Sequence, residues 1–299
     1  MNSKLRESVS PEFAFSPAAS KSSLTLVDVG ARGGIHERWR PFHSELRVVA
    51  FEPDPVECER LKKESFPYEI RFLPFALGAQ SGTAATLHIC KKPGCSSLLL
   101  PNRALCDQFD FGSNMEVIGQ YAMTLSRLDA VCDVQPDMLK IDTQGTELDI
   151  LHGAGRLLDE VKAVELEVEF VPQYEGQALF ADVDCFMRSK GFMLRGLRRT
   201  SWRQRAPTPH AFGGQLIHGD VLYLRHEILD CRAGHIILAA YRQYDLLARL
   251  GAMDLIPKQS ASTRFAGRLL SGWSNRELRR KVDRLRPPTA SDWHDPDFF

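Results

Sequence analysis

Hydrophobic and polar positions follow two patterns from residue 24 onward. Short apolar runs typical of buried strands recur along the chain, and segments with the spacing of amphipathic helices lie between them. Strands are predicted at 24–29, 47–51, 69–73, 84–90, 120–125, 137–142, 161–169 and 220–225, and helices at 54–65, 145–159 and 181–190. This alternation predicts an α/β fold with a doubly wound, mostly parallel sheet. Ligands of such sheets bind beyond the carboxyl ends of the strands.

The same pattern divides the chain into three parts. Residues 1–22 are rich in Ser, Pro and Ala and are predicted to form a flexible arm, 23–226 form the α/β domain, and 227–299 form a helical extension. Segment 77–130 is too long for a simple crossover, so we interpret it as an inserted hairpin that either roofs the pocket or is decorative. Segment 264–286 is basic and amphipathic. It can lie on an anionic membrane surface or dock on its own domain or a second subunit, and docking is favoured.

Composition narrows the class of protein. Apolar residues make up 43% of the 299 positions, enough for a core, and the net charge of zero argues against a nucleic-acid partner. Seven scattered cysteines form no Cys-x-x-Cys pair. The absence of a signal peptide and of an apolar run of about 20 residues predicts a soluble, cytoplasmic protein.

A glycine-rich turn follows the first predicted strand and carries the clearest ligand signal. It reads Asp28-Val-Gly30-Ala-Arg32-Gly-Gly34, and Glu52 ends the next strand. Glycines let a backbone approach an adenosyl ligand, and an acid at this spacing binds ribose hydroxyls. Arg32 would obstruct a pyrophosphate, and Asp28 suits a cationic ligand. S-adenosylmethionine is therefore favoured, although the turn alone is also compatible with any strand-to-helix connection.

Acidic residues at strand ends are the candidates for catalysis. Asp142 ends the apolar strand 137–142, where an acid can deprotonate or anchor an acceptor hydroxyl, or cap the next helix. Glu165 and Glu167 share one face of a later strand with Glu169. Glu167 is the second catalytic candidate, and Glu165 is a candidate for substrate binding. An equal alternative is that these glutamates form a solvated face of an edge strand.

Other segments supply binding candidates. Ala76 and Leu77 follow the third strand, where an adenine ring would lie. Arg198 and Trp202 belong to a basic loop that can bind phosphate and stack on a sugar, with a solvated basic loop as the alternative. Histidine and cysteine spacing requires no metal, and each histidine is interpreted as structural or superficial.

Several motifs occur in a characteristic order. They are Asp28-Val-Gly-Ala-Arg-Gly-Gly34, Phe51-Glu-Pro-Asp54, Ala76-Leu-Gly78, Ser96-Ser-Leu98 and Leu139-Lys-Ile-Asp-Thr-Gln-Gly-Thr-Glu147. Together they resemble the FkbM family of S-adenosylmethionine-dependent methyltransferases over roughly residues 24–225. Arg32 stands where family members commonly have Asn.

The resemblance implies a class I methyltransferase-like (Rossmann-like) fold and O-methylation of a small-molecule or glycan hydroxyl, and it makes Glu147 an acceptor-site or structural residue. Two alternatives are a nicotinamide-dependent oxidoreductase and a non-catalytic member that binds the cofactor.

Overall fold

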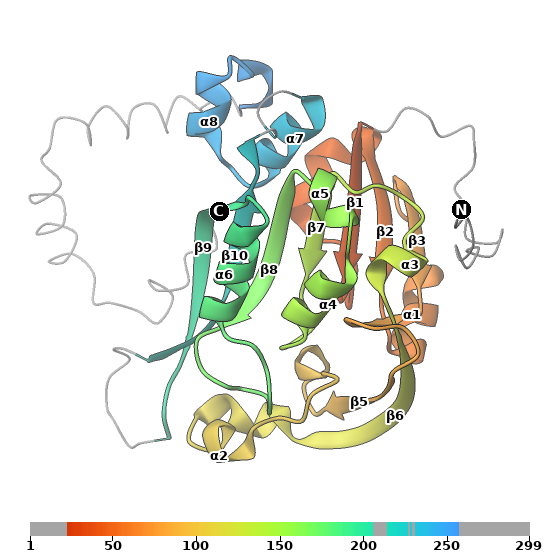
Figure 1. Cartoon of the computed structure of the whole chain (residues 1–299), viewed down its shortest axis with the longest axis vertical. Helices are drawn as coiled ribbons and strands as arrows, with labels where there is room; N and C mark the ends of the chain where they lie inside the picture. The colour runs from red at the N-terminus through yellow and green to blue at the C-terminus, as the bar shows by residue number, and fades with distance from the viewer. Residues whose placement is uncertain (1–22, 206–213, 227, 229–230, 257–299) are drawn as a thin grey trace, which may run out of the picture.

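A seven-stranded sheet forms the centre of the computed structural model, which describes residues 23–205, 214–226, 228 and 231–256 (Figure 1). Its strands follow the order β3-β2-β1-β7-β8-β10-β9. They are β1 Leu24–Val29, β2 Leu46–Phe51, β3 Glu69–Leu73, β7 Met138–Ile141, β8 Ala163–Glu169, β9 Met193–Trp202 and β10 Gln215–Leu224. β10 runs antiparallel to both of its neighbours, β8 and β9, and the other neighbouring strands of this sheet are parallel. The predicted α/β fold with a doubly wound, mostly parallel sheet is confirmed.

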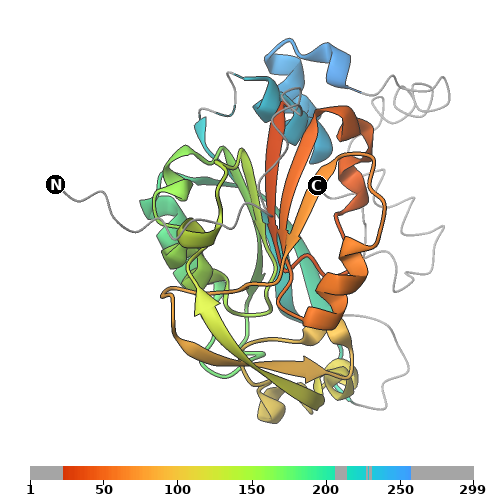
Figure 2. The same ribbon diagram turned by 90° about the vertical axis from the view of Figure 1, so that its right-hand side faces the viewer.

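Helices cover both faces of the sheet (Figures 1 and 2). On one face α4 Glu147–Gly153, α5 Leu157–Glu160 and α6 Phe180–Ser189 pack on apolar strand residues such as Val27 and Val29. On the other face lie the 3₁₀ segment η2 Glu37–Glu45, α1 Pro55–Lys62 and α7 Arg232–Ala240. The two apolar layers place the core on either side of the sheet.

Local chemistry explains where the helices begin and end. Asp54 caps α1 by accepting a hydrogen bond from the Val56 amide at 3.0 Å, and Pro55 occupies the first turn, as predicted. Pro41 lies inside η2, and a proline removes a helical hydrogen bond. The helix predicted over 145–159 is two short helices, because Gly155 adopts a left-handed φ of 51° between α4 and α5.

The prediction of a basic loop around Arg198 is wrong. Residues 193–202 form β9, the edge strand, whose only partner in this sheet is β10. Edge strands often carry charged residues such as arginine, which prevent pairing with other chains. A prediction based on hydrophobic runs therefore misses such a strand. Likewise, the alternative that Glu165 and Glu167 lie on a solvated edge is wrong, because β8 lies between β7 and β10 and both side chains are buried.

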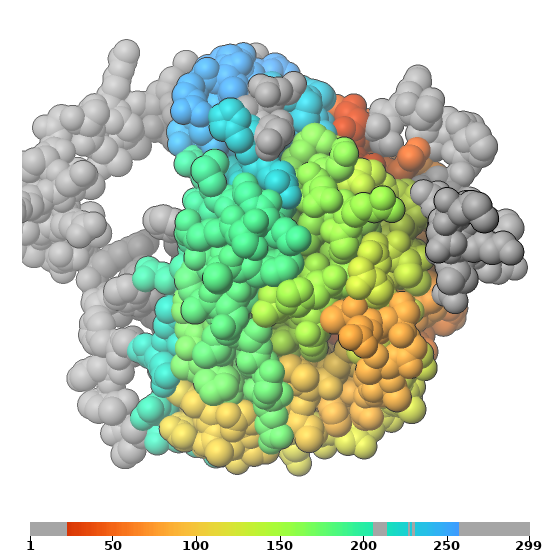
Figure 3. All heavy atoms as spheres, viewed as in Figure 1, coloured from red at the N-terminus to blue at the C-terminus, as the bar shows by residue number. Residues whose placement is uncertain are grey.

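The insertion forms a small unit beyond the carboxyl ends of the parallel strands. A three-stranded sheet joins β4 Ala76–Leu77, β6 Val117–Ser126 and β5 Ala84–Cys90. The short elements η3 Pro93–Cys95, α2 Arg103–Cys106 and η4 Asp110–Met115 complete it. In the space-filling view its orange and yellow residues lie directly against the green residues of the main domain (Figure 3).

The described part of the C-terminal extension packs at the opposite end of the sheet (Figure 1). It comprises α7, α8 Tyr244–Arg249 and η6 Met253–Leu255, so helices are confirmed there. The Tyr241 hydroxyl donates to Glu165, and the Arg38 guanidinium lies 4.4 Å from the centre of the Tyr241 ring. The predicted arm 1–22 and the basic segment 264–286 lie outside the described residues.

None of the helices within the described ranges is long and apolar enough to cross a membrane.

Candidate active site

The glycine turn brings three strand ends together. Gly30 has a φ of 81°, and a Cβ atom at this position would lie 1.9 Å from the backbone oxygen of Asp142. The amides of Gly30 and Ala31 both donate to the Phe51 carbonyl at 3.0 Å. Only glycine tolerates both the left-handed conformation and this approach. The carboxyl ends of β1, β2 and β7 therefore meet around one residue.

A cleft of about 830 Å³, measured to its open mouth, lies over these strand ends. Its lining includes predicted site residues from four separate segments: the cofactor-binding candidates Gly30, Arg32, Glu52, Ala76 and Leu77 and the catalytic candidate Asp142. Pro93, Gly94 and Ser96–Leu98 of the insertion contribute as well, so the prediction that segment 77–130 helps to roof the pocket is confirmed.

Glu52 is held in the cleft by the backbone beyond β2. Its side chain is buried, and Oε1 accepts a hydrogen bond from the Asp54 amide at 2.9 Å. Burial raises the pKa of the Glu52 carboxyl to about 7. Arg32 forms an ion pair with Asp54 beside it.

Asp28 lies next to the cleft but is not among the residues lining it. It is 2% exposed, and Lys140 on the neighbouring strand donates to its Oδ1 at 3.1 Å. Burial raises the pKa of Asp28, and Lys140 opposes the shift. The same ammonium lies 3.8 Å from Oδ2 of Asp142. The prediction that Asp28 contacts a cationic ligand relied on its negative charge, and the ammonium of Lys140 balances that charge. Gly34, another predicted cofactor-binding residue, also lies outside the lining of the cleft.

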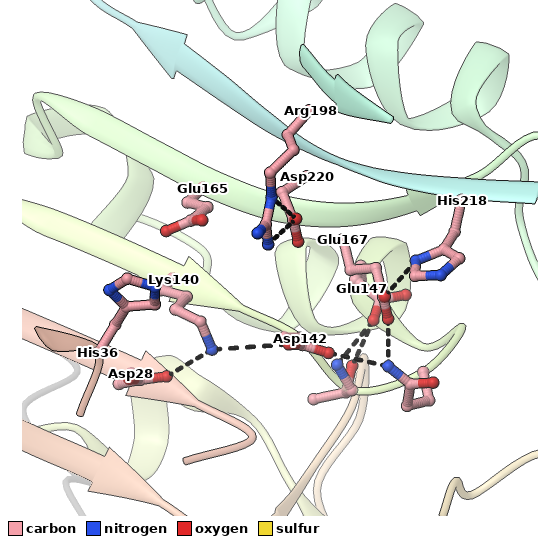
Figure 4. A network of polar contacts seen from close by, with 12 residues as sticks. Asp28, His36, Lys140, Asp142, Glu147, Glu165, Glu167, Arg198, His218 and Asp220 are labelled. Atoms are coloured by element: carbon pink, nitrogen blue, oxygen red, sulfur yellow. Dashed lines mark hydrogen bonds and ion pairs between the residues drawn. The ribbon is translucent and has the colours of Figure 1, made fainter. Parts of the chain in front are cut away.

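Two carboxyl groups, Asp142 and Glu167, are joined by one amide (Figure 4). The Gln144 side-chain nitrogen donates to Oδ1 of Asp142 at 2.9 Å and to Oε2 of Glu167. Gln144 itself has a left-handed φ of 61°, and the Tyr174 hydroxyl donates to its side-chain oxygen at 3.0 Å. The structure therefore brings the two predicted catalytic residues into one network, with Asp142 lining the cleft.

Two other predicted acids have structural partners. Both oxygens of Glu147 accept backbone hydrogen bonds, from Thr143 at 2.7 Å and from Gly145 at 2.9 Å. Burial raises the pKa of Glu147 to about 7. Glu165 is 4% exposed and bonds to Arg38 and Tyr241. The contacts of Glu147 are those of a residue that holds the loop, which is one of its two predicted roles, and the contacts of Glu165 connect it to the C-terminal extension.

The two predicted substrate-binding residues of the basic strand β9 have different surroundings. Arg198 pairs with Asp220 on β10, and its side chain is 42% exposed. Trp202 is only 7% exposed and packs against Phe109 and Phe111 of the insertion. The ring faces of Trp202 are therefore occupied by the core, and the proposed stacking on a sugar is not supported.

Comparisons with known proteins identify the family. The model of the methyltransferase FkbM domain matches residues 28–194. The chain belongs to the FkbM methyltransferase family. The match lies inside the predicted domain 23–226 and includes every motif on which the resemblance rests.

Individual relatives are more distant. The chain is 34% identical over 94 residues, 31% of its length, to a polyribonucleotide nucleotidyltransferase of Anaplasma marginale, of which it spans 11%. An FkbM methyltransferase structure from Methylobacillus flagellatus KT matches 68% of this chain and 43% of its own at 18% identity and a TM-score of 0.36. Magnesium protoporphyrin IX methyltransferase from Synechocystis PCC 6803, solved with bound SAM, matches 70% of this chain and 73% of its own at 13% identity and a TM-score of 0.35.

The methyl donor of this FkbM family member is S-adenosylmethionine, and the cleft offers suitable groups for it. Glu52 provides a carboxylate for ribose hydroxyls, as acids at this strand end do. Phe75, Ala76 and Leu77 provide an apolar wall for an aromatic base. Asp142 provides negative charge at the end of β7, where a cationic donor would be stabilised.

Three residues of the family member's polar network are missing from the sequence-based candidates: Gln144, Tyr174 and His218. His218 Nδ1 lies 2.6 Å from Oε1 of Glu167. His218 lies near the start of β10, two residues before Asp220, but the strand was predicted only from residue 220. A strand predicted from 215 would have marked His218 as a site residue. Tyr174 has no such signal, because it lies in the loop after β8.

Replacing Glu52 with glutamine is expected to weaken S-adenosylmethionine binding about 10- to 150-fold, because charged hydrogen bonds are worth about 1.5–3 kcal/mol. Since the pKa of Glu52 is about 7, the affinity of the native protein should rise between mildly acidic and mildly alkaline pH as the carboxylate forms. Calorimetric titrations of both proteins across this range check the result. The amino group of the donor titrates in the experiments with both proteins, so the difference between the two pH curves reports on Glu52 alone. Parallel curves would contradict the assignment of Glu52 to donor binding.

Proposed function

We propose that the chain is an O-methyltransferase that acts on a hydroxyl of a sugar, a glycan or a related natural-product intermediate. The observation that carries the proposal is the polar character of the sheet edge beside the donor cleft (Figure 4). Asp142, Glu167 and His218 lie there with the Arg198–Asp220 pair. These are groups that exchange hydrogen bonds with hydroxyls.

The polar groups extend across neighbouring strands. Lys140 pairs in register with Asp28 on one side and Glu165 on the other, and Asp220 pairs with Glu167. On the same face, a crevice of about 1830 Å³ including its open side is lined by His36, Arg38 and Arg198, among others. Most of these groups already pair with one another, but the side chain of Arg198 is partly exposed. A hydroxyl-rich acceptor can exchange hydrogen bonds with such a group, and an apolar acceptor cannot.

The chain's own residues have a limited chemical task. When bound, S-adenosylmethionine supplies a methyl group already activated on a sulfonium, so the protein must mainly align the acceptor oxygen with it. Asp142 can accept a hydrogen bond from the acceptor hydroxyl and fix its direction. The loop from Thr143 to Glu147 is held by its own internal hydrogen bonds, and the insertion limits access of water.

Label transfer tests the proposal directly. The purified protein is incubated with methyl-labelled S-adenosylmethionine and a panel of nucleotide sugars and glycan extracts, and products are separated and tested for alkali-stable ethers. Labelled ethers are the expected result. Label on nitrogen or carbon instead would refute O-methylation, and donor binding without transfer to any acceptor would favour a non-catalytic family member.

A further inference from the structure

His218 is connected to the cleft through a continuous set of polar contacts. Asp142 and Gln144 line the cleft, Gln144 donates to Glu167, and Glu167 contacts Nδ1 of His218 at 2.6 Å. His218 also pairs across strands with Glu169, the last residue of β8, which places it at the carboxyl edge of the parallel strands. The imidazole therefore lies on the edge where an acceptor must approach.

The two ring nitrogens of His218 have different surroundings. Nδ1 faces Glu167, which is buried, while the His218 side chain is 23% exposed. Within the described ranges no hydrogen bond involves Nε2 of His218. When one imidazole nitrogen donates to a carboxylate, the other carries the lone pair. This arrangement leaves Nε2 as the proton acceptor.

We propose that Nε2 of His218 is the general base that removes the acceptor's hydroxyl proton, and that Glu167 acts as a positioning residue that holds the imidazole in the required tautomer. This inference rests on the proposed O-methyl transfer. The acceptor oxygen forms a bond to the methyl carbon as the carbon–sulfur bond breaks, and the electron pair of that bond remains on sulfur. The hydroxyl proton passes to Nε2 and from there to water.

Glu167 suits this positioning role because each of its oxygens has its own partner. Oε1 faces His218, and Oε2 accepts from Gln144. A carboxylate so placed stabilises the imidazolium that forms when Nε2 takes the proton. Asp142 then remains free to accept the hydrogen bond of the acceptor or to balance the sulfonium charge.

The pair should titrate as one unit. Burial, together with the neighbouring carboxylates, raises the pKa of Glu167 well above its usual value, and burial lowers the pKa of His218. The charged groups that influence the pair are Lys92, Asp142, Glu147, Glu169, Arg198 and Asp220. The two pKa values shift in opposite directions, so the protonation of Glu167 and that of His218 are coupled, and the form with ionised Glu167 and an unprotonated Nε2 is favoured at the alkaline end. Turnover should therefore rise with pH as Glu167 ionises.

The first experiment reads the tautomer and needs no acceptor. The full chain, carrying ¹⁵N-labelled histidine rings and saturated with S-adenosylhomocysteine, is followed by long-range NMR from mildly acidic to mildly alkaline pH. His218→Gln identifies the resonances. The expected result at the alkaline end is a protonated Nδ1 and an unprotonated Nε2. A protonated Nε2 throughout would overturn the proposal.

The second experiment reads turnover on the acceptor found by label transfer. His218→Gln should lower kcat by about 100-fold or more, the usual contribution of a general base, without changing donor affinity. Glu167→Gln should lower kcat less, and His152→Gln, which changes a histidine that packs edge-on against Phe186, is the matched control. Native kcat and an unchanged pH profile in His218→Gln would overturn the proposal. If the native protein modified no acceptor, the proposed function would fail, while the NMR experiment would still decide the state of the pair.

Discussion

Replacing Asp142 with asparagine is expected to lower kcat for methyl transfer while leaving the donor bound. Asparagine preserves the shape of the side chain and can still accept a hydrogen bond from Gln144, but it removes the negative charge next to the cleft. If Asp142 anchors the acceptor, the loss of a charged hydrogen bond of about 1.5–3 kcal/mol predicts a reduction of about 10- to 150-fold. Steady-state kinetics and calorimetry with S-adenosylhomocysteine check the two halves of this expectation.

The pH profile of the Asp142→Asn variant separates anchoring from proton removal. If Asp142 only anchors the acceptor, kcat of the variant should still fall toward low pH, as in the native protein. If Asp142 is the general base, its loss should lower kcat by about 100- to 10,000-fold and remove this fall, the acidic limb of the profile. If the acidic limb of the kcat profile is lost in Asp142→Asn and retained in His218→Gln, proton removal is assigned to Asp142 instead of His218. Asp107→Asn, at an exposed ion pair with Arg103 in the insertion, is the matched control.

Replacing Gly30 with alanine is expected to destabilise the protein and to abolish donor binding together. The left-handed φ of 81° costs a residue with a Cβ about 1–2 kcal/mol. The new methyl group would also lie 1.9 Å from the Asp142 carbonyl oxygen, and displacing packed groups typically costs about 1–3 kcal/mol more. Urea unfolding measures the free energy, and calorimetry measures donor affinity.

Gly82 provides the matched comparison for this prediction. Its φ is 84°, but a Cβ there would meet no atom within 4 Å. Gly82→Ala should therefore show only the conformational cost and keep donor affinity. Equal losses of stability in the two variants would show that the close approach between Gly30 and Asp142 has no energetic weight.

Sequence reasoning succeeds where the chain has strong local signals. The strands 24–29, 69–73 and 84–90 match β1, β3 and β5 residue for residue, because continuous or alternating apolar positions specify them. Glu52 and Gly30 could be placed in the cleft because strand, turn and acid follow one another at short range. These features depend on neighbours in the chain, which a sequence displays.

The remaining site residues could not be predicted because their roles depend on distant partners. Lys140 balances Asp28 across 112 residues, and Tyr174 fixes Gln144 from the loop after β8. Trp202 looks available for stacking until the insertion supplies Phe109 and Phe111. The strand predicted over 220–225 begins at Gln215 in the structure, so the pairing of β10 with β8 that places His218 beside Glu167 was hidden. Long-range pairing creates this information, and no local pattern carries it.

The hydrogen bond between Tyr241 and Glu165 has a practical consequence for dissecting the molecule. A shortened chain that stops at residue 226 would retain the family domain but would leave the Glu165–Arg38 pair without its hydroxyl partner. It would also uncover apolar residues of β1 and η2 against which α7 packs, inviting aggregation. Fragments intended for expression or crystallisation should therefore extend at least through Ile256.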